Sequence, residues 1–113
     1  GRDLWRGPPG HPAAAIGAAR AAQSGWARTP LDERIAVLRR FAALVSEHKD
    51  AFADLIARET GKPLWEARTE VDTVVAKVDI SVRAQAERAG TRELGSGQRL
   101  AHKPHGVLAV LGP

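Results

Sequence analysis

Side chains that could perform acid–base or metal chemistry are few in this sequence, and they are scattered along it. Glu66 and Glu70 are one helical turn apart, a spacing that places two carboxylates on one face of a helix. No histidine stands four residues from either glutamate to complete a metal site. We therefore interpret both as solvated helix charges. The chain contains no cysteine, which excludes a disulfide, a thiolate metal site and a cysteine nucleophile within these 113 residues.

The four histidines do not form a recognisable metal-binding pattern. His102 and His105 are close in sequence, but an extended backbone points positions three apart to opposite faces, so we expect no shared metal. His11 and His48 stand near predicted helix starts, and we expect both to be exposed.

Two glycine-containing segments invite comparison with phosphate-binding loops, and neither fits. Before Gly61-Lys62, a phosphate loop needs a glycine where Ile56 stands, and it needs a Ser or Thr where Pro63 stands. Gly95-Ser96-Gly97 lacks the third glycine of a dinucleotide fingerprint, which would fall at Leu100. We expect a helix stop and start at the first segment and a turn between strands at the second.

Composition indicates an ordinary globular protein, with 43% hydrophobic and 27% charged residues. No segment resembles a secretory signal or a membrane span, so we expect a cytoplasmic location and no membrane partner. The net charge of +4 raises the possibility of nucleic-acid binding. A binding face concentrates its charge, whereas these arginines alternate with acids, so we expect solvated helix faces and no nucleic acid. The arginines are Arg20, Arg28, Arg34, Arg39, Arg40, Arg58, Arg68, Arg83 and Arg88.

Helix signals fill most of the sequence up to residue 90. Pro12 suits the first helical position of a segment that continues to about Trp26. Thr29 is a candidate N-cap for a second helix that begins near Pro30. The apolar pattern pauses at 46–49, and a third helix follows. Gly61 ends it, and Pro63 opens a long fourth helix that Gly90 terminates.

The second of these helices carries a wide apolar stripe at helical spacing. We expect this helix to be well buried. The stripe consists of Leu31, Ile35, Leu38, Ala42 and Val45, widened by Phe41 and Leu44.

The pattern changes after Gly90. Residues 91–103 alternate around a glycine turn and predict a hairpin. Residues 107–111 read Val-Leu-Ala-Val-Leu, apolar on both faces, which is typical of a strand inside a parallel sheet covered on both sides. No second strand of this kind occurs in the sequence. We therefore expect its neighbours to lie beyond Pro113 and the chain to be incomplete.

The amino-terminal end also indicates that the chain is incomplete. The sequence contains no methionine, so we expect Gly1 not to be a natural start. Residues 1–10 predict the tail of a strand followed by a turn.

Taken in order, these segments resemble the aldehyde dehydrogenase superfamily along essentially the whole chain. The segments that carry the resemblance are Trp26-Ala27-Arg28, Pro30-Leu31-Asp32-Glu33-Arg34, Glu59-Thr60-Gly61-Lys62-Pro63 and the run from His105 to Pro113. The residues around Glu66 and 103–110 are most similar to the subfamily that oxidises succinylglutamate semialdehyde in bacterial arginine breakdown.

The resemblance implies an α/β fold, mostly α in this chain. Residues 1–90 would be the helical amino-terminal part of the NAD-binding, Rossmann-like domain. Residues 91–103 would be a strand excursion to the oligomerisation sheet, and 104–113 the first, incomplete part of the Rossmann-like sheet. The implied partners are the remainder of the same enzyme chain, a homo-oligomer and a small-molecule aldehyde.

The implied chemistry is an NAD-dependent oxidation of an aldehyde to an acid. A cysteine thiolate attacks the carbonyl, hydride passes to the nicotinamide, and a glutamate-activated water hydrolyses the thioester. In the family these groups, the oxyanion asparagine and the cofactor-binding residues all follow the Gly-Pro at 112–113. We therefore assign no catalytic, cofactor-binding or metal-binding residue here, and we expect the isolated chain to bind no NAD and to be inactive. A basic helical nucleic-acid-binding module and a protein-interaction module are the alternatives.

Overall fold

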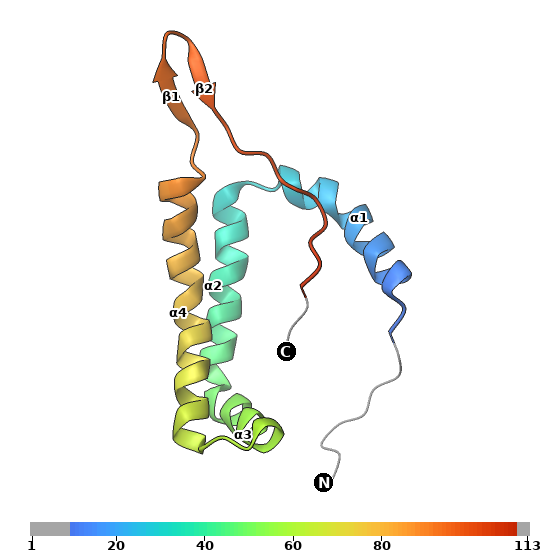
Figure 1. The fold of residues 1–113 in the computed structure, drawn as a ribbon, viewed down its shortest axis with the longest axis vertical. Helices are drawn as coiled ribbons and strands as arrows, with labels where there is room; N and C mark the ends of the chain where they lie inside the picture. Colours follow the sequence, from blue (N-terminus) through green and yellow to red (C-terminus); the bar gives the residue numbers. More distant parts are fainter. Residues whose placement is uncertain (1–9, 111–113) are drawn as a thin grey trace.

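The computed structural model describes residues 10–110, which form four helices followed by a two-stranded antiparallel sheet (Figure 1). The elements are α1 (Pro12–Arg28), α2 (Leu31–Glu47), α3 (Lys49–Thr60), α4 (Leu64–Arg88), β1 (Arg92–Gly95) and β2 (Gln98–Leu100).

Prolines and one glycine set several helix ends, as predicted. Pro12 is the first residue of α1, where its missing N–H leaves no hydrogen bond unmade. Gly61 ends α3 in the left-handed conformation, with φ of 76°, and its N–H donates to the Ala57 carbonyl. Pro63 is the N-cap of α4. These ends depend on local backbone preferences, which explains why the sequence alone predicts them.

The prediction for Thr29 is wrong. This residue caps the end of α1, not the start of α2: its backbone N–H and its hydroxyl both donate to the Gly25 carbonyl. Pro30 is the N-cap of α2, and no side chain caps that helix. The carbonyls of the last turn of a helix lack a full set of partners within the helix, and the Thr29 hydroxyl adds a second hydrogen bond to one of them.

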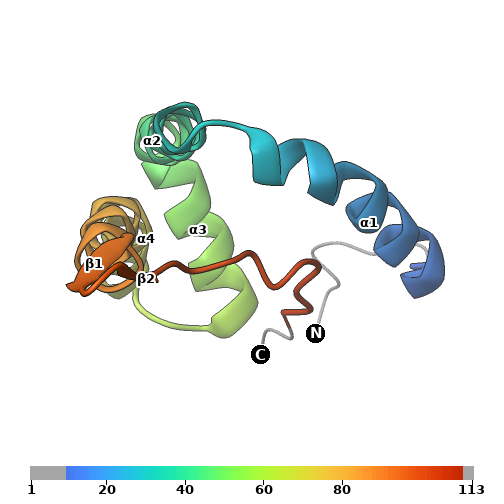
Figure 2. The same cartoon turned by 90° about the horizontal axis from the view of Figure 1, so that it is seen from above.

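The hydrophobic core is small and lies where α2, α3 and α4 meet (Figure 2). Only four of the described side chains are buried, and three of the four lie on α3 or α4. Ile56, Ala57 and Val75 pack against them. The buried set is Val45, Ala53, Ala67 and Val71.

The expectation that α2 is well buried is also wrong. Val45 is its single buried residue, whereas Phe41 is 50% exposed and Leu44 is 47% exposed. The helix packs on α4 along one edge and on α3 near its end, and the described residues leave the rest of its apolar stripe uncovered.

The hairpin predicted for 91–103 is confirmed. β1 and β2 pair antiparallel with Arg92 opposite Leu100 and Glu93 opposite Arg99. All three residues of the connecting turn, Gly95-Ser96-Gly97, have positive φ, which explains the glycines on either side of Ser96. Every residue of the two strands is exposed, and the hairpin projects beyond the end of α4 (Figure 1).

The strand predicted for residues 107–111, whose neighbours we expect beyond Pro113, does not form within the described residues and stays a prediction. Residues 107–110 form no regular structure, and Leu108 and Val110 are each 80% exposed. Leu111 lies outside the described residues, as does the strand tail expected within 1–9. A strand forms only against a hydrogen-bonded neighbour, and 10–110 supply none beside this segment.

The chain as a whole is extended and open. Its radius of gyration is 18.6 Å, compared with about 13 Å for a compact domain of similar length. Its accessible surface of 9615 Å² likewise exceeds the roughly 6,000 Å² expected for a compact protein of 12.1 kDa. None of the helices described combines the length and apolarity needed to span a membrane.

Candidate functional site

Glu66 and Glu70 share one partner, the amine of Lys62. Lys62 Nζ donates to Glu70 Oε1 and lies 4.0 Å from Glu66 Oε1. The hydrogen bond to Glu70 is the main cause that raises the pKa of Lys62, and the charge of Glu66 contributes to the same shift. The two glutamates therefore share a lysine that lies just before their own helix, and this is a structural arrangement and not an acid–base pair open to a substrate.

Neither glycine segment forms a cradle for a dinucleotide. At the first, the Gly61 N–H bonds to the end of α3, Pro63 has no N–H to offer, and the Lys62 amine is held by glutamates. The second segment, 95–97, is a hairpin turn that leads into a strand and not into a helix. Pyrophosphate binding needs free N–H groups at a helix start, so neither of these two segments fits the pyrophosphate of NAD.

The four histidines are exposed. His105 lines an open cavity together with Arg20 and Gln23, and the positive charge of Arg20 disfavours a cation there. Within residues 10–110, no three His, Cys, Asp or Glu side chains are grouped in a way that could hold a metal ion.

Three ion pairs join different helices among the described residues. Each engages one basic side chain of α2, α3 or α4 with an acid of a neighbouring helix. The pairs between helices are Arg39–Asp79 at 3.5 Å, Lys49–Asp72 at 2.7 Å and Arg68–Asp50 at 3.0 Å.

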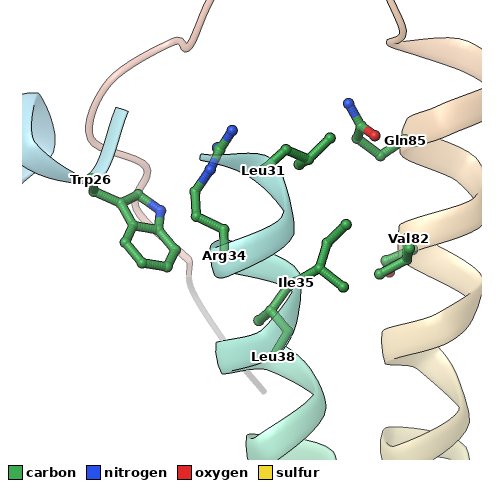
Figure 3. Close-up of a pocket in the computed structure, with 8 residues that line it drawn as sticks. Trp26, Leu31, Arg34, Ile35, Leu38, Val82 and Gln85 are labelled. Carbon is green, nitrogen blue, oxygen red and sulfur yellow. The ribbon is translucent and has the colours of Figure 1, made fainter. Parts of the chain in front are cut away.

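A cavity of about 220 Å³ opens where the end of α1 meets α2 and α4 (Figure 3). We call it the corner cavity. Trp26 reaches it from α1, and Val82 and Gln85 line it from α4. Its walls are mainly apolar, with polar groups at one end. The complete lining is Trp26, Leu31, Arg34, Ile35, Leu38, Ser81, Val82 and Gln85.

Arg34 is the one charged residue in that lining. Its Nε is buried and has no hydrogen-bond partner, and none of the ion pairs found among the described residues includes its guanidinium. An unsatisfied buried donor costs about 1–3 kcal/mol, and more when the group is charged. This cost distinguishes Arg34 from the arginines that are paired with acids.

A second cavity, of about 180 Å³, is lined only by apolar side chains of α2, α3 and α4. Phe41 and Phe52 flank it, and both are more than 40% exposed. Exposed aromatic side chains around an open apolar cavity indicate a surface that another element covers.

Sequence reasoning missed the two basic residues that the structure makes prominent. The spacing of Lys62, Glu66 and Glu70, each four residues after the last, is a signal that could have identified the first. Nothing in the sequence distinguishes Arg34 from the other arginines. Its isolation depends on how α1, α2 and α4 are arranged.

Comparison with known proteins identifies the family of this chain. Residues 10–113 match the aldehyde dehydrogenase family. The N-succinylglutamate 5-semialdehyde dehydrogenases of Novosphingobium aromaticivorans and Sphingopyxis alaskensis are 54% and 55% identical over all of this chain. A protein of Caulobacter vibrioides, named N-succinylglutamate 5-semialdehyde dehydrogenase 1, is 59% identical over 88% of it.

These alignments cover 25%, 24% and 22% of the three relatives, so the chain spans about a quarter of the length of the curated relatives it matches. The family match extends over nearly the whole chain, from the residue before His11 to the last proline. The chain belongs to the aldehyde dehydrogenase family.

Proposed function

We propose that this chain is the amino-terminal, mainly helical part of an NAD-dependent dehydrogenase that oxidises N-succinylglutamate semialdehyde to the corresponding acid. The observation that carries the proposal is the identity of more than 50% to several proteins bearing that name, two of them over the whole chain. The enzyme would act in the cytoplasm, as a homo-oligomer, in arginine breakdown.

Within that enzyme, we assign the chain to three parts. Residues 1–90 belong to the NAD-binding domain, 91–103 to the oligomerisation sheet and 104–113 to the first part of the Rossmann-like sheet. The exposed apolar run at 107–110 supports this division, because these residues have no covering element in the described part of the chain. The hairpin supports it too, since both of its strands are exposed and it projects away from the helices.

The chain itself contributes a scaffold and no chemistry. The sequence contains no cysteine, the nucleophile that the family's reaction needs. Neither glycine segment fits a dinucleotide, which supports our proposal that NAD, the hydride acceptor, binds in other parts of the enzyme. We therefore expect the 113-residue chain alone to produce no NADH.

The experiment compares the full-length protein that carries this segment with the 113-residue chain. Each is supplied with NAD and N-succinylglutamate semialdehyde, and NADH is followed by absorbance. N-acetylglutamate semialdehyde, whose smaller acyl group also keeps the amine from cyclising onto the aldehyde, is the matched control substrate.

We expect activity from the full-length protein alone, with kcat/KM for the succinylated substrate on the order of 100-fold higher than for the control. Equal rates on both aldehydes would contradict the substrate assignment. Activity of the short chain would contradict the assignment of this segment as a scaffold.

A further inference from the structure

The guanidinium of Arg34 has no acidic partner in the described part of the chain, although the cavity beside it is large enough for a side chain. We propose that the corner cavity receives an aspartate or glutamate from the polypeptide outside these 113 residues, and that its carboxylate pairs with Arg34. This inference rests on one element of the proposed function, namely that the chain is part of a longer protein.

The chemistry of the lining favours a carboxylate. Arginine presents a planar fork of N–H donors that matches a carboxylate with two parallel hydrogen bonds. Arg34 lines the cavity, and its buried Nε lacks a hydrogen-bond partner. No acid lines the cavity, and Ser81 and Gln85 add a hydroxyl and an amide that can hold a second carboxylate oxygen.

The surroundings favour a protein segment over a free anion. Three rim residues are large and apolar, and each is more than 40% exposed: Trp26, Leu31 and Leu38. A small carboxylate ion would leave these side chains in water, whereas a chain segment carrying an acidic residue would cover them as well.

We favour the remainder of the polypeptide as the occupant of the corner cavity because it is long. The relatives are about four times as long as this chain. The surface exposed here exceeds that of a compact protein by thousands of Å². Several acids of α3 and α4 are already paired, with Arg39, Lys49, Lys62 and Arg68, and none of the described acids lines the cavity.

The first test locates the occupant without disturbing Arg34. A photo-crosslinking amino acid replaces Gln85 in the full-length protein, and the crosslinked peptides are identified by mass spectrometry. The same amino acid at Lys77, an exposed position on α4 that does not line the cavity, is the control. A mixture of heavy-isotope-labelled and unlabelled protein distinguishes crosslinks within one chain from those between copies.

We expect the Gln85 position, and not the Lys77 position, to crosslink within one chain to a peptide from beyond residue 113 that contains an aspartate or glutamate. Crosslinks between copies would assign the cavity to a subunit interface and overturn the proposal. Crosslinks confined to residues 1–113, or none, would overturn it as well.

The second test measures the pairing. Arg34→Gln and Arg34→Lys are compared with Arg39→Gln, which removes an exposed α2 arginine that is paired with Asp79. We expect Arg34→Gln to raise the equilibrium constant for unfolding roughly tenfold or more, Arg34→Lys to recover only part of the loss, and Arg39→Gln to have little effect.

Replacing the crosslinked acid by its amide should then add nothing to Arg34→Gln, because the two changes remove one interaction. Additive losses, or equal losses for Arg34→Gln and Arg39→Gln, would overturn the pairing. Both tests measure structure and not turnover. An enzyme inactive on N-succinylglutamate semialdehyde would therefore contradict the substrate assignment without contradicting the pairing of Arg34.

Discussion

The body formed by α2, α3 and α4 differs sharply from the region formed by α1 and residues 101–110. Both are rich in apolar residues, but every buried side chain found in the described part of the chain belongs to the body. In the body, helices lie side by side and small residues such as Ala53 and Ala67 let them approach. In the other region, α1 meets residues 105–108 across open cavities of about 250 and 320 Å³.

The difference shows that apolar composition does not produce a core unless two elements run alongside each other. No other described helix or strand packs on α1, and no strand pairs with 107–110. The body can therefore hold its own shape, whereas the second region depends on cover from outside the described residues. The predictions that follow test this contrast, beginning with the largest effect.

The centre of the body is its most sensitive point. Val71 is 2% exposed, and Val71→Asp would place a carboxylate among apolar side chains with no partner. We expect a loss of about 4–5 kcal/mol or more in the free energy of unfolding, enough to unfold the helices. Circular dichroism of the 113-residue chain would measure the loss of helical signal. A helical signal equal to that of the unaltered chain would show that the body has no specific core.

Leu108 provides the matched change in the other region. It is 80% exposed, so Leu108→Asp should leave the helical signal of the 113-residue chain unchanged. In the full-length protein, where we propose that 107–111 is a buried strand, the same change should cost at least about 2 kcal/mol. Thermal melting of both proteins gives the comparison, and a neutral effect in the longer one would argue against the buried strand.

Gly61 tests the end of α3 within the body. Its φ of 76° disfavours a side chain, so Gly61→Ala should cost about 1 kcal/mol. Gly25→Ala is the control, since Gly25 lies inside α1, has open space around it, and should gain slightly from the higher helix propensity of alanine. Chemical denaturation monitored by circular dichroism would separate the two, and equal effects would contradict the structural role of Gly61.

The smallest effect concerns Lys62. Its pKa is raised above 10.5 in the folded chain, mainly by the hydrogen bond to Glu70, so its contribution to stability is fully present below pH 10.5. That contribution is lost as pH rises through the folded pKa. Lys62→Gln should lower the melting temperature slightly at neutral pH, and the gap to the unaltered chain should close in strong alkali. A gap independent of pH would mean that the amine's charge is not involved.

Much of the local structure follows from short stretches of sequence. Pro12, Gly61 and Pro63 act through their own backbone preferences, and Gly95-Ser96-Gly97 forms the turn that two glycines favour. The family resemblance also depends on such segments in a fixed order. Thr29 is a position that local sequence does not decide. Its hydroxyl stands between the end of α1 and the start of α2, and the geometry of the link between the two helices selects the end of α1.

The amino-acid order alone therefore accounts for where helices and the hairpin begin and end, since those choices involve interactions over a few residues. It could not assign burial. Phe41 and Val45 lie on one predicted stripe, yet one is 50% exposed and the other 8%, because α4 covers only one edge of α2. The partner of Lys62, the isolation of Arg34 and the absence of a strand at 107–110 depend likewise on what stands beside each residue in space. Contacts of that kind join segments far apart in the chain, and three-dimensional packing alone establishes them.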